Sequence, residues 1–259
     1  MNEINRIIIE EITNTIHDVN LTREKPQFGD PIIRFADAAN PMFTELKTLV
    51  HPGHFTPYDL MPDAKTVIAY FVPAHEDIAI GNQVETWATK EWSLQKGYTK
   101  TLMDEITARV QKRLAAINVN CSGNSESEIP FDTTKFTHPW SLKAVAYIAG
   151  VGRFGLNQLI ITEKGCAGRL GSFVINAAAD YNKTIEEEYC LYRIDGSCHA
   201  CVDRCPADAY DPNRWGGLDK QKCKAKSKEQ KEIYKDVPGA TEACAKCQAP
   251  QCFMQIPQR

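Results

Sequence analysis

The cysteine spacing constrains this chain more than any other feature. Of its 10 cysteines, eight lie between residues 190 and 252. Short spacings let successive thiolates wrap one face of a metal centre, while a distant cysteine completes the ligand set. We therefore interpret these residues as metal ligands. They are Cys190, Cys198, Cys201, Cys205, Cys223, Cys244, Cys247 and Cys252.

One stretch of this region carries a specific motif. Cys198-His-Ala-Cys201-Val-Asp-Arg-Cys205-Pro206 matches the end of the bacterial ferredoxin pattern C-x2-C-x2-C-x3-C-P. In that pattern, the cysteine before the proline binds the other cluster of a pair. The motif therefore predicts two [4Fe-4S] clusters.

The interleaved pattern divides the thiols into two sets. The set for the second cluster is complete and consists of Cys205, Cys223, Cys244 and Cys247. In the first set, Cys198 and Cys201 pair with Cys252, but Asp195 stands where the pattern has its first cysteine. We predict Cys190 as the missing ligand, because thiolates are the usual ligands and Gly196 lets the loop double back. Ligation by Asp195, or a three-iron cluster that leaves Asp195 unused, is the alternative.

Zinc held by the two CxxC pairs is the alternative to iron–sulfur clusters. The Cys-Pro dipeptide, the uneven x3 and x4 spacings and the total of eight thiols argue against zinc. The other two cysteines, Cys121 and Cys166, are interpreted as buried or loop thiols, since neither has a recognisable base nearby in the sequence.

Composition and charge limit the class of protein. With 43% hydrophobic and 24% charged residues, the chain is expected to be a soluble folded protein. Acids interrupt the apolar residues at the N-terminus and no apolar run approaches eighteen residues, so we expect no export signal and no membrane span. A cytoplasmic location follows, where thiols stay reduced and available for ligation.

The net charge of -3 and pI of about 6.1 argue against nucleic acid as a partner. Residues 220–235 are rich in lysine, but Glu229 and Glu232 interrupt them, which favours a solvated helix face. An acidic redox partner is the other candidate for this face. We expect the electron donor to be of the ferredoxin or flavodoxin type.

The hydrophobic pattern predicts an α/β core in residues 1–185 and the cysteine module in residues 186–259, with a charged patch at the boundary. The predicted segments are a helix at 3–17, a strand at 66–72, a helix at 83–117, a helix at 139–150, and strands at 159–162 and 169–176.

Within the segment at 83–117, Gly97 is a possible break in the helix, and Trp87 and Trp92 are interpreted as packing residues.

A glycine turn follows the predicted helix at 139–150. Its residues 150–155 fit the letters G-x-G-x-x-G, but a dinucleotide site needs a strand before the turn and a helix after it. The order here is reversed. We therefore predict a flexible turn where backbone approaches backbone or a ligand. Its backbone amides are candidates to bind an anionic or planar cofactor.

The histidines carry less information. His51 and His54 flank a Pro-Gly turn that is expected to expose them, and His138 is a candidate pocket residue at the head of the helix at 139–150.

Several of these stretches resemble a known family. Residues 139–157, 159–165 and 168–172 are similar to the central segment of epoxyqueuosine reductase-like iron–sulfur proteins, and residues 198–206, Cys223 and 244–247 are similar to their ferredoxin module. This resemblance implies a nitroreductase-like α/β core, related to that of reductive dehalogenases, followed by a ferredoxin-like domain with two cubanes. It also implies a cobalamin in the core that receives electrons from the clusters. The residues that would surround a corrinoid or substrate cavity are Gly150, Gly152, Gly155, Asn157, Gly168 and Arg169.

The chain departs from this family at three places. Phe136 stands where the family has an aspartate proton donor, and Asp132 is the nearest acid upstream. Cys252 is followed by Phe253 instead of proline, and the chain ends soon afterwards, where the family has helices that help hold transfer RNA. These departures argue against the reduction of an epoxide on transfer RNA.

Two functions remain. The first is a cytosolic oxidoreductase that passes electrons through two clusters to a cobalamin-like cofactor or a small substrate in the core. The second is an electron-transfer partner, or a partner that reactivates a corrinoid protein, with no substrate chemistry of its own. A core cavity on the order of several hundred Å³ or more would favour the first.

Overall fold

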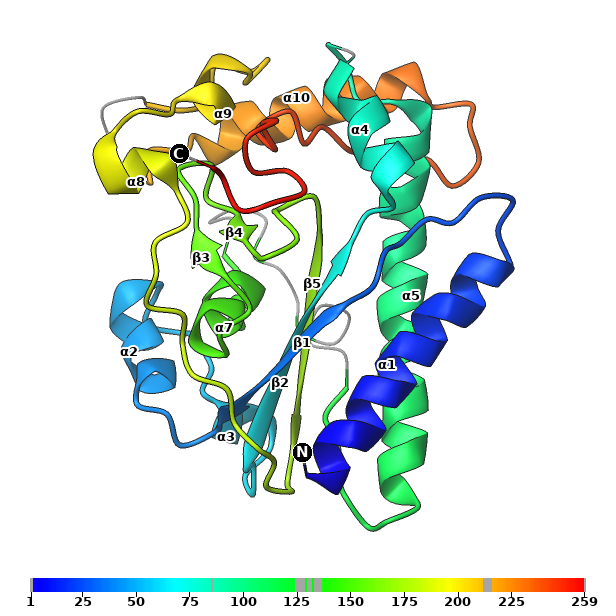
Figure 1. Ribbon diagram of the computed structural model, residues 1–259, viewed down its shortest axis with the longest axis vertical. Helices are drawn as coiled ribbons and strands as arrows, with labels where there is room; N and C mark the ends of the chain where they lie inside the picture. Colours follow the sequence, from blue (N-terminus) through cyan, green and yellow to red (C-terminus); the bar gives the residue numbers. More distant parts are fainter. Residues whose placement is uncertain are drawn as a thin grey trace.

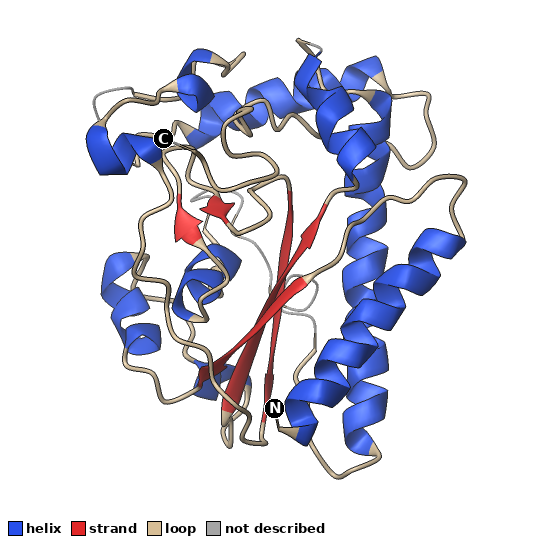
Figure 2. Ribbon diagram, viewed as in Figure 1, coloured by secondary structure: helices blue, strands red, loops and turns tan. Residues whose placement is uncertain are grey.

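The fold has three layers, with one sheet between two layers of helices (Figure 1, Figure 2). Its strands run in the order β1-β2-β5, and both neighbouring pairs are antiparallel. They are β1 (Ile32–Asp37), β2 (Thr66–Pro73) and β5 (Gly168–Ile175). The computed structural model describes residues 2–84, 86–123, 129, 132, 137–211 and 216–258. The mixed α/β class predicted from the sequence is confirmed.

The central strand β2 is buried along its whole length. Because side chains alternate along a strand, Val67 and Phe71 enter one core, while Ile68 and Tyr70 enter the other. A strand covered on both faces is continuously apolar. This explains why the apolar run at 66–72 was a reliable strand prediction.

One face of the sheet is covered by two long helices, α1 (Glu3–Leu21) and α5 (Lys90–Ala115), which pack against each other. The buried residues of α1 recur at helical spacing and include Ile8 and Ile12. The side chain of Asn2 accepts a hydrogen bond from the amide of Ile4 and so caps α1. The predicted helix at 3–17 is confirmed and extends to Leu21.

The other face carries α2 (Met42–Leu49), α3 (Pro57–Leu60) and α7 (Leu142–Ile148). Ser141 caps α7 by accepting a hydrogen bond from the amide of Ala144. The helix ends where Gly150 takes a left-handed φ of +77°. The predicted helix at 139–150 is therefore confirmed, with a shorter span.

The helix predicted at 83–117 is confirmed over most of its length, but its start lies in a separate helix. The segment contains the end of α4 (Glu76–Val84) and then α5, which begins after its cap Thr89. Gly97 lies inside α5 and does not break it. A side chain there would overlap the carbonyl oxygen of Gly239, so glycine permits the loop after α10 to approach. Trp92 is 1% exposed and packs as predicted, but Trp87 is 38% exposed with the Nζ of Lys226 over its ring.

The strand predictions at 159–162 and 169–176 are confirmed by β4 (Ile160–Ile161) and β5. Two strands were not predicted: β1, and β3 (Arg153–Phe154), which pairs with β4 directly after the glycine turn. Strand β3 is only two residues long and so leaves no periodicity to detect.

The cysteine-rich region lies across one end of the sheet, above the β3–β4 hairpin and beside α4 (Figure 1). Its helices are α8 (Leu191–Asp195), α9 (Ala200–Asp203) and α10 (Lys220–Ile233). The thiols pack directly against core residues such as Leu156 and Ile161. The domain boundary near residue 186 stays a prediction.

The loop between β4 and β5 receives the C-terminal segment of the chain. The amide of Cys166 donates to the carbonyl oxygen of Cys252 at 2.9 Å, and the amide of Ala167 donates to that of Phe253 at 2.8 Å. Gly165, with φ +75°, leaves room for this segment, since a side chain there would overlap the backbone at Phe253.

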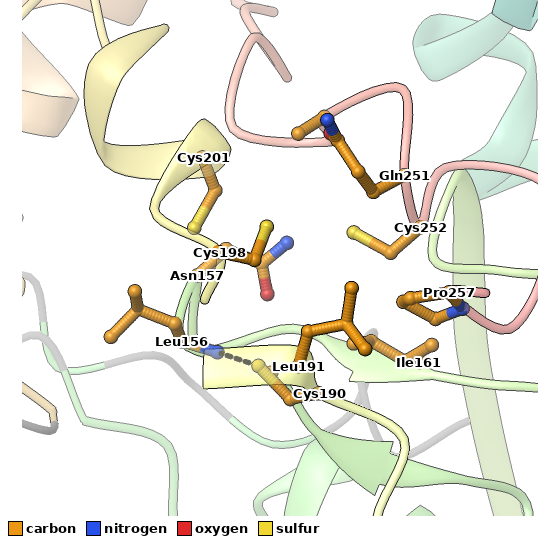
Figure 3. Close-up of a pocket in the computed structure, with 12 residues that line it drawn as sticks. Leu156, Asn157, Ile161, Cys190, Leu191, Cys198, Cys201, Gln251, Cys252 and Pro257 are labelled. Carbon is orange, nitrogen blue, oxygen red and sulfur yellow. Dashed lines mark hydrogen bonds between the residues drawn. The ribbon is translucent and has the colours of Figure 1, made fainter. Parts of the chain in front are cut away.

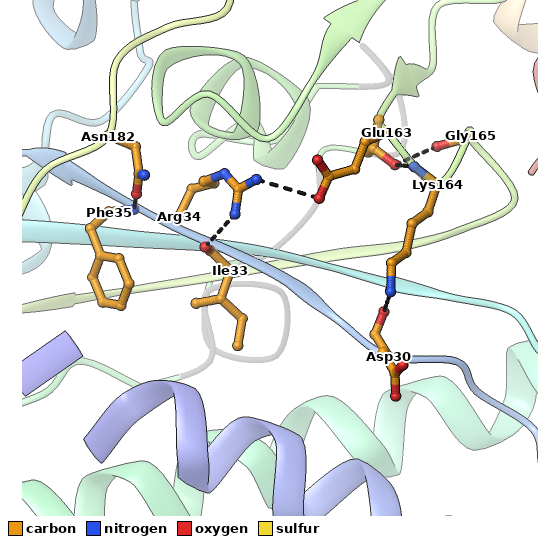
Figure 4. Close-up of polar contacts among 9 residues, drawn as sticks. Asp30, Ile33, Arg34, Phe35, Glu163, Lys164, Gly165 and Asn182 are labelled. Atoms are coloured by element: carbon orange, nitrogen blue, oxygen red, sulfur yellow. Dashed lines mark hydrogen bonds and ion pairs between the residues drawn. The ribbon is translucent and has the colours of Figure 1, made fainter. Parts of the chain in front are cut away.

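Polar contacts fix the same loop to β1 from the other side (Figure 4). Glu163 pairs with Arg34 at 3.4 Å, and the Nζ of Lys164 donates to the carbonyl oxygen of Asp30 at 3.1 Å. The loop is therefore held between the sheet and the C-terminal segment.

Two left-handed glycines allow a matched test of this packing. We expect Gly165→Ala to lower the free energy of unfolding by on the order of 3 kcal/mol, since overlap with the C-terminal segment adds to backbone strain. Gly196→Ala, at φ +76° with no atom within 4 Å, should cost only about 1 kcal/mol. Urea unfolding followed by circular dichroism measures both, and equal losses would contradict the packing role of Gly165.

Candidate metal centre

Four of the predicted ligands surround one small cavity of about 20 Å³, open to solvent at its mouth (Figure 3). They come from the loop before α8, the segment before α9, α9 itself and the C-terminal segment. Asn157, Leu156 and Ile161 of the hairpin region complete the wall. The four thiols around this cavity are called the first group: Cys190, Cys198, Cys201 and Cys252.

Cys190 is held by its neighbours. Its Sγ accepts a hydrogen bond from the amide of Leu156 at 3.4 Å. The Oε1 of Glu188 accepts the amides of Tyr189 and Cys190 at 3.0 and 3.1 Å. Amide donors to sulfur stabilise its negative charge and are one way in which proteins set the potential of a cluster.

The remaining four predicted ligands form a second group: Cys205, Cys223, Cys244 and Cys247. Burial raises the pKa of Cys223, and the thiols of Cys244 and Cys205 raise it further. Burial and the same neighbours raise the pKa of Cys247 to about 12. Mutual repulsion of this kind requires the four sulfur atoms to lie near one another.

The two groups adjoin. Burial raises the pKa of Cys201, and the added causes include Cys252 of its own group and Cys247 of the other. Asn157 ties them to the core, since its Nδ2 donates to the carbonyl oxygen of Cys247 at 3.0 Å. The hydroxyl of Tyr210 donates to the carbonyl oxygen of Asn157 at 2.9 Å. A bound metal ion would replace the protons of such buried thiols and so stabilise the thiolates.

Lysine side chains place positive charge beside the second group. Lys143 donates to the carbonyl oxygen of Gln158 at 2.9 Å, and burial lowers its pKa against the opposing effect of Cys247 and Cys223. Lys246, which is buried, donates to the carbonyl oxygen of Asn82. These charges offset part of the negative charge that four thiolates would carry.

Asp195 is exposed, and its Oδ1 accepts the amide of Ser197 at 2.9 Å, whereas Cys190 lines the cavity. The identity of the fourth ligand stays a prediction that this arrangement favours. All 10 cysteines are free thiols. Within the described part of the chain, no three His, Cys, Asp or Glu side chains converge closely enough to hold a single metal ion.

A further thiol joins the first group. The Sγ of Cys166 is buried 3.9 Å from that of Cys252 and 3.7 Å from the Nδ2 of Asn157. The predicted burial of Cys166 is confirmed, but no spacing pattern links it to Cys252. Cys121 lies apart from both groups, beside Ile175 at the edge of β5.

Only some of the residues predicted to surround a corrinoid line the cavity of the first group. Gly155 and Asn157 line the cavity of the first group. Side chains at Gly150 and Gly152 would overlap the carbonyl oxygens of Lys183 and Ile161, and one at Gly168 would overlap β2. The guanidinium group of Arg169 lies 5.8 Å from the ring centre of Trp92. In the glycine turn, backbone therefore approaches backbone.

The histidines bind backbone groups around the start of α7. His54 is buried, contrary to the predicted exposure, and its Nε2 accepts the amide of Ser141 at 3.0 Å, while burial lowers its pKa. The ring of His51 contacts the carbonyl oxygen of His138 at 3.3 Å. His138 contacts Trp140 and does not line the cavity of the first group. Phe136 lies outside the described residues.

A second cavity, of about 160 Å³, lies between α7, β3 and α8 and was not predicted from the sequence. Its residues come from separate segments, so no local motif marks it. They are Tyr147, Arg153, Phe154, Glu188 and Arg193.

No protein-family model matches the chain, and no curated protein matches it. Among solved structures, the epoxyqueuosine reductase from Streptococcus thermophilus is similar, with a TM-score of 0.55 and 20% identity over 92% of this chain and 64% of that chain. An epoxyqueuosine reductase with an epoxyqueuosine-modified tRNA-Tyr stem loop has a TM-score of 0.54 and 19% identity over 92% and 63%. A reductive dehalogenase with a proposed mechanism for B12-dependent dehalogenation has a TM-score of 0.54 and 15% identity over 85% and 29%.

The chain therefore shares the fold of epoxyqueuosine reductases and reductive dehalogenases over about nine-tenths of its length, and it spans less than two-thirds of those reductases. Separately, none of the helices in the described residues is long and apolar enough to cross a bilayer.

The choice between Cys190 and Asp195 is testable by iron content. After anaerobic preparation, we expect Cys190→Ala to lose up to about half of the bound iron, because it removes a thiolate of the first group. Asp195→Asn should keep its iron, as should the control Cys121→Ala, which removes a thiol outside both groups. Loss of iron in Asp195→Asn with full retention in Cys190→Ala would reverse the assignment.

Proposed function

We propose that this chain is an iron–sulfur oxidoreductase in which the first and second thiol groups each hold one [4Fe-4S] cluster. One observation supports this most strongly: eight thiols from separate segments gather into two adjoining groups of four. On this proposal, residues 1–185 form a nitroreductase-like core and residues 186–259 a ferredoxin-like module.

The residues present fit such clusters. Thiolates are their usual ligands, and the chain supplies amide donors to sulfur at Cys190 and at Cys205, where the amide of Ala209 donates at 3.5 Å. When bound, the clusters supply one-electron transfer at a potential that these hydrogen bonds and the burial set. Leu156 and Ile161 keep water from one wall of the first group.

The same residues do not fit a corrinoid. Backbone carbonyl oxygens lie against two of the turn glycines, Gly150 and Gly152, and Asn157 is engaged with the thiol groups. The two cavities, of about 20 and 160 Å³, lie below the range for drug-sized ligands, and a corrinoid is larger than those. We therefore propose delivery of electrons to a small molecule, with no corrinoid step.

We propose that electrons enter at the second group, from a ferredoxin or flavodoxin. Cys223 lies on α10, which carries six lysines and two glutamates in a chain with a net charge of -3. Lys228 and Lys231 are exposed on this helix. Acidic electron carriers are attracted to such a face, which steers their encounter.

An electron relay to a separate enzyme is the second candidate. The small size of both cavities favours it over an enzyme that encloses a large cofactor. A small substrate that oxidises the reduced protein would distinguish the two, since a pure relay needs its protein partner.

The central test is chemical analysis of anaerobically purified protein. We expect about eight irons and about eight sulfides per chain, with a paramagnetic signal after reduction. About four irons would leave one cluster, and iron-free protein with bound zinc would refute the proposal.

The entry face is tested by charge reversal. In Lys228→Glu/Lys231→Glu, we expect reduction by an acidic ferredoxin to slow about tenfold at low salt, with the difference vanishing near ~0.5 M salt. Reduction by dithionite should not change. The matched control, Lys112→Glu/Arg113→Glu, makes the same charge change on exposed residues at the end of α5. Equal slowing in both variants would exclude α10 as the entry face.

A further inference from the structure

The second cavity has features of a binding site that the proposed electron transfer leaves unused. Its wall combines two guanidinium groups, one carboxylate and two aromatic rings. A role for this site in the reaction rests on the proposed function, whereas the arrangement of its side chains does not.

Among the side chains that line this cavity, positive charges outnumber negative ones. Arg153 and Arg193 share the Oε2 atom of Glu188, at 3.6 Å and 2.7 Å respectively. Two cations therefore face one carboxylate, whose Oε1 is engaged with the amides of Tyr189 and Cys190. A guanidinium group matches a carboxylate with two parallel hydrogen bonds.

Arg153 is already fixed in place. Its side chain is 15% exposed, and its Nη1 donates to the hydroxyl of Tyr147 at 3.0 Å and to the carbonyl oxygen of Ile185 at 2.7 Å. Its guanidinium carbon also lies 5.1 Å from the ring centre of Tyr147. A ligand would thus meet an ordered cation, which reduces the entropy lost on binding.

The aromatic part of the wall suits a flat molecule. The rings of Tyr147 and Phe154 lie with centroids 5.8 Å apart and planes inclined by 39°. Aromatic rings favour offset or edge-to-face contact with a third ring. The cavity, of about 160 Å³, restricts the ligand to a small molecule.

The cavity shares a wall with the first thiol group. Arg193 lies on α8, one turn after Cys190, and its amide donates to the carbonyl oxygen of Cys190 at 2.8 Å. Glu188 contacts both guanidinium groups and the amide of Cys190. A molecule in this cavity would therefore lie beside the proposed first cluster.

We propose that this cavity, which we call the arginine pocket, binds a small aromatic carboxylate next to the first thiol group. The ligand carboxylate binds Arg193 in exchange for Glu188, and Arg153 adds a second positive charge. Its ring packs against Tyr147 and Phe154. Glu188 keeps its hydrogen bonds to the amides of Tyr189 and Cys190.

The test is titration calorimetry of the anaerobic, iron-loaded protein with four probes. Benzoate should bind most tightly. Cyclohexanecarboxylate, which keeps the charge but is not flat, should bind several-fold more weakly. Benzamide, which keeps the ring without the charge, should bind about tenfold more weakly or not at all. Phosphate that binds as well as benzoate would overturn the aromatic part, and absence of benzoate binding would overturn the proposal.

Two variants assign the site. Arg193→Gln should weaken benzoate binding about tenfold, and Phe154→Leu should weaken it about threefold. Arg113→Gln, an exposed arginine on α5, is the matched control and should bind as the unmodified chain does. Unchanged binding in Arg193→Gln would place benzoate elsewhere. Iron content is measured on the same samples, so an iron-poor protein that still binds benzoate would refute the clusters and leave the pocket standing.

Discussion

Backbone hydrogen bonds between the C-terminal segment and the β4–β5 loop hold the first thiol group together. Cys252 comes from a segment with no strand or long helix of its own, and its position depends on the amides of Cys166 and Ala167. The loop in turn is fixed to β1 through Glu163 and Lys164. Contacts that begin at a buried sheet thus fix the position of Cys252, a predicted ligand that lies 86 residues beyond Cys166 in the sequence.

Burial of the thiols makes it energetically costly to form thiolates in this region. Desolvation disfavours the thiolate and crowded thiolates repel one another, which raises the pKa of Cys201 and of Cys247. Lys143 and Lys246 reduce the cost without removing it. Metal binding and folding of this region are therefore expected to be strongly coupled.

The sequence predicted those features that arise from local periodicity or short spacing. The continuous apolar run of β2 and the isoleucine spacing of α1 both act within a few residues. Gly97 was misjudged because its role depends on Gly239, which is distant in sequence. The arginine pocket and the place of Cys166 beside Cys252 escaped prediction for the same reason, since only tertiary packing brings their parts together. The division of the thiols into two ligand sets remains a prediction from spacing that the observed grouping supports.

Glu188 gives the molecule a thermodynamic link between two events. One of its carboxylate oxygens orients the amide of Cys190, and the other faces the guanidinium groups of Arg153 and Arg193. With the proposed cluster in the first thiol group, a ligand that draws an arginine away would leave more negative charge on Glu188 and so make an electron there less favourable. By reciprocity, the oxidised cluster would favour binding of such a ligand, and reduction would promote its release.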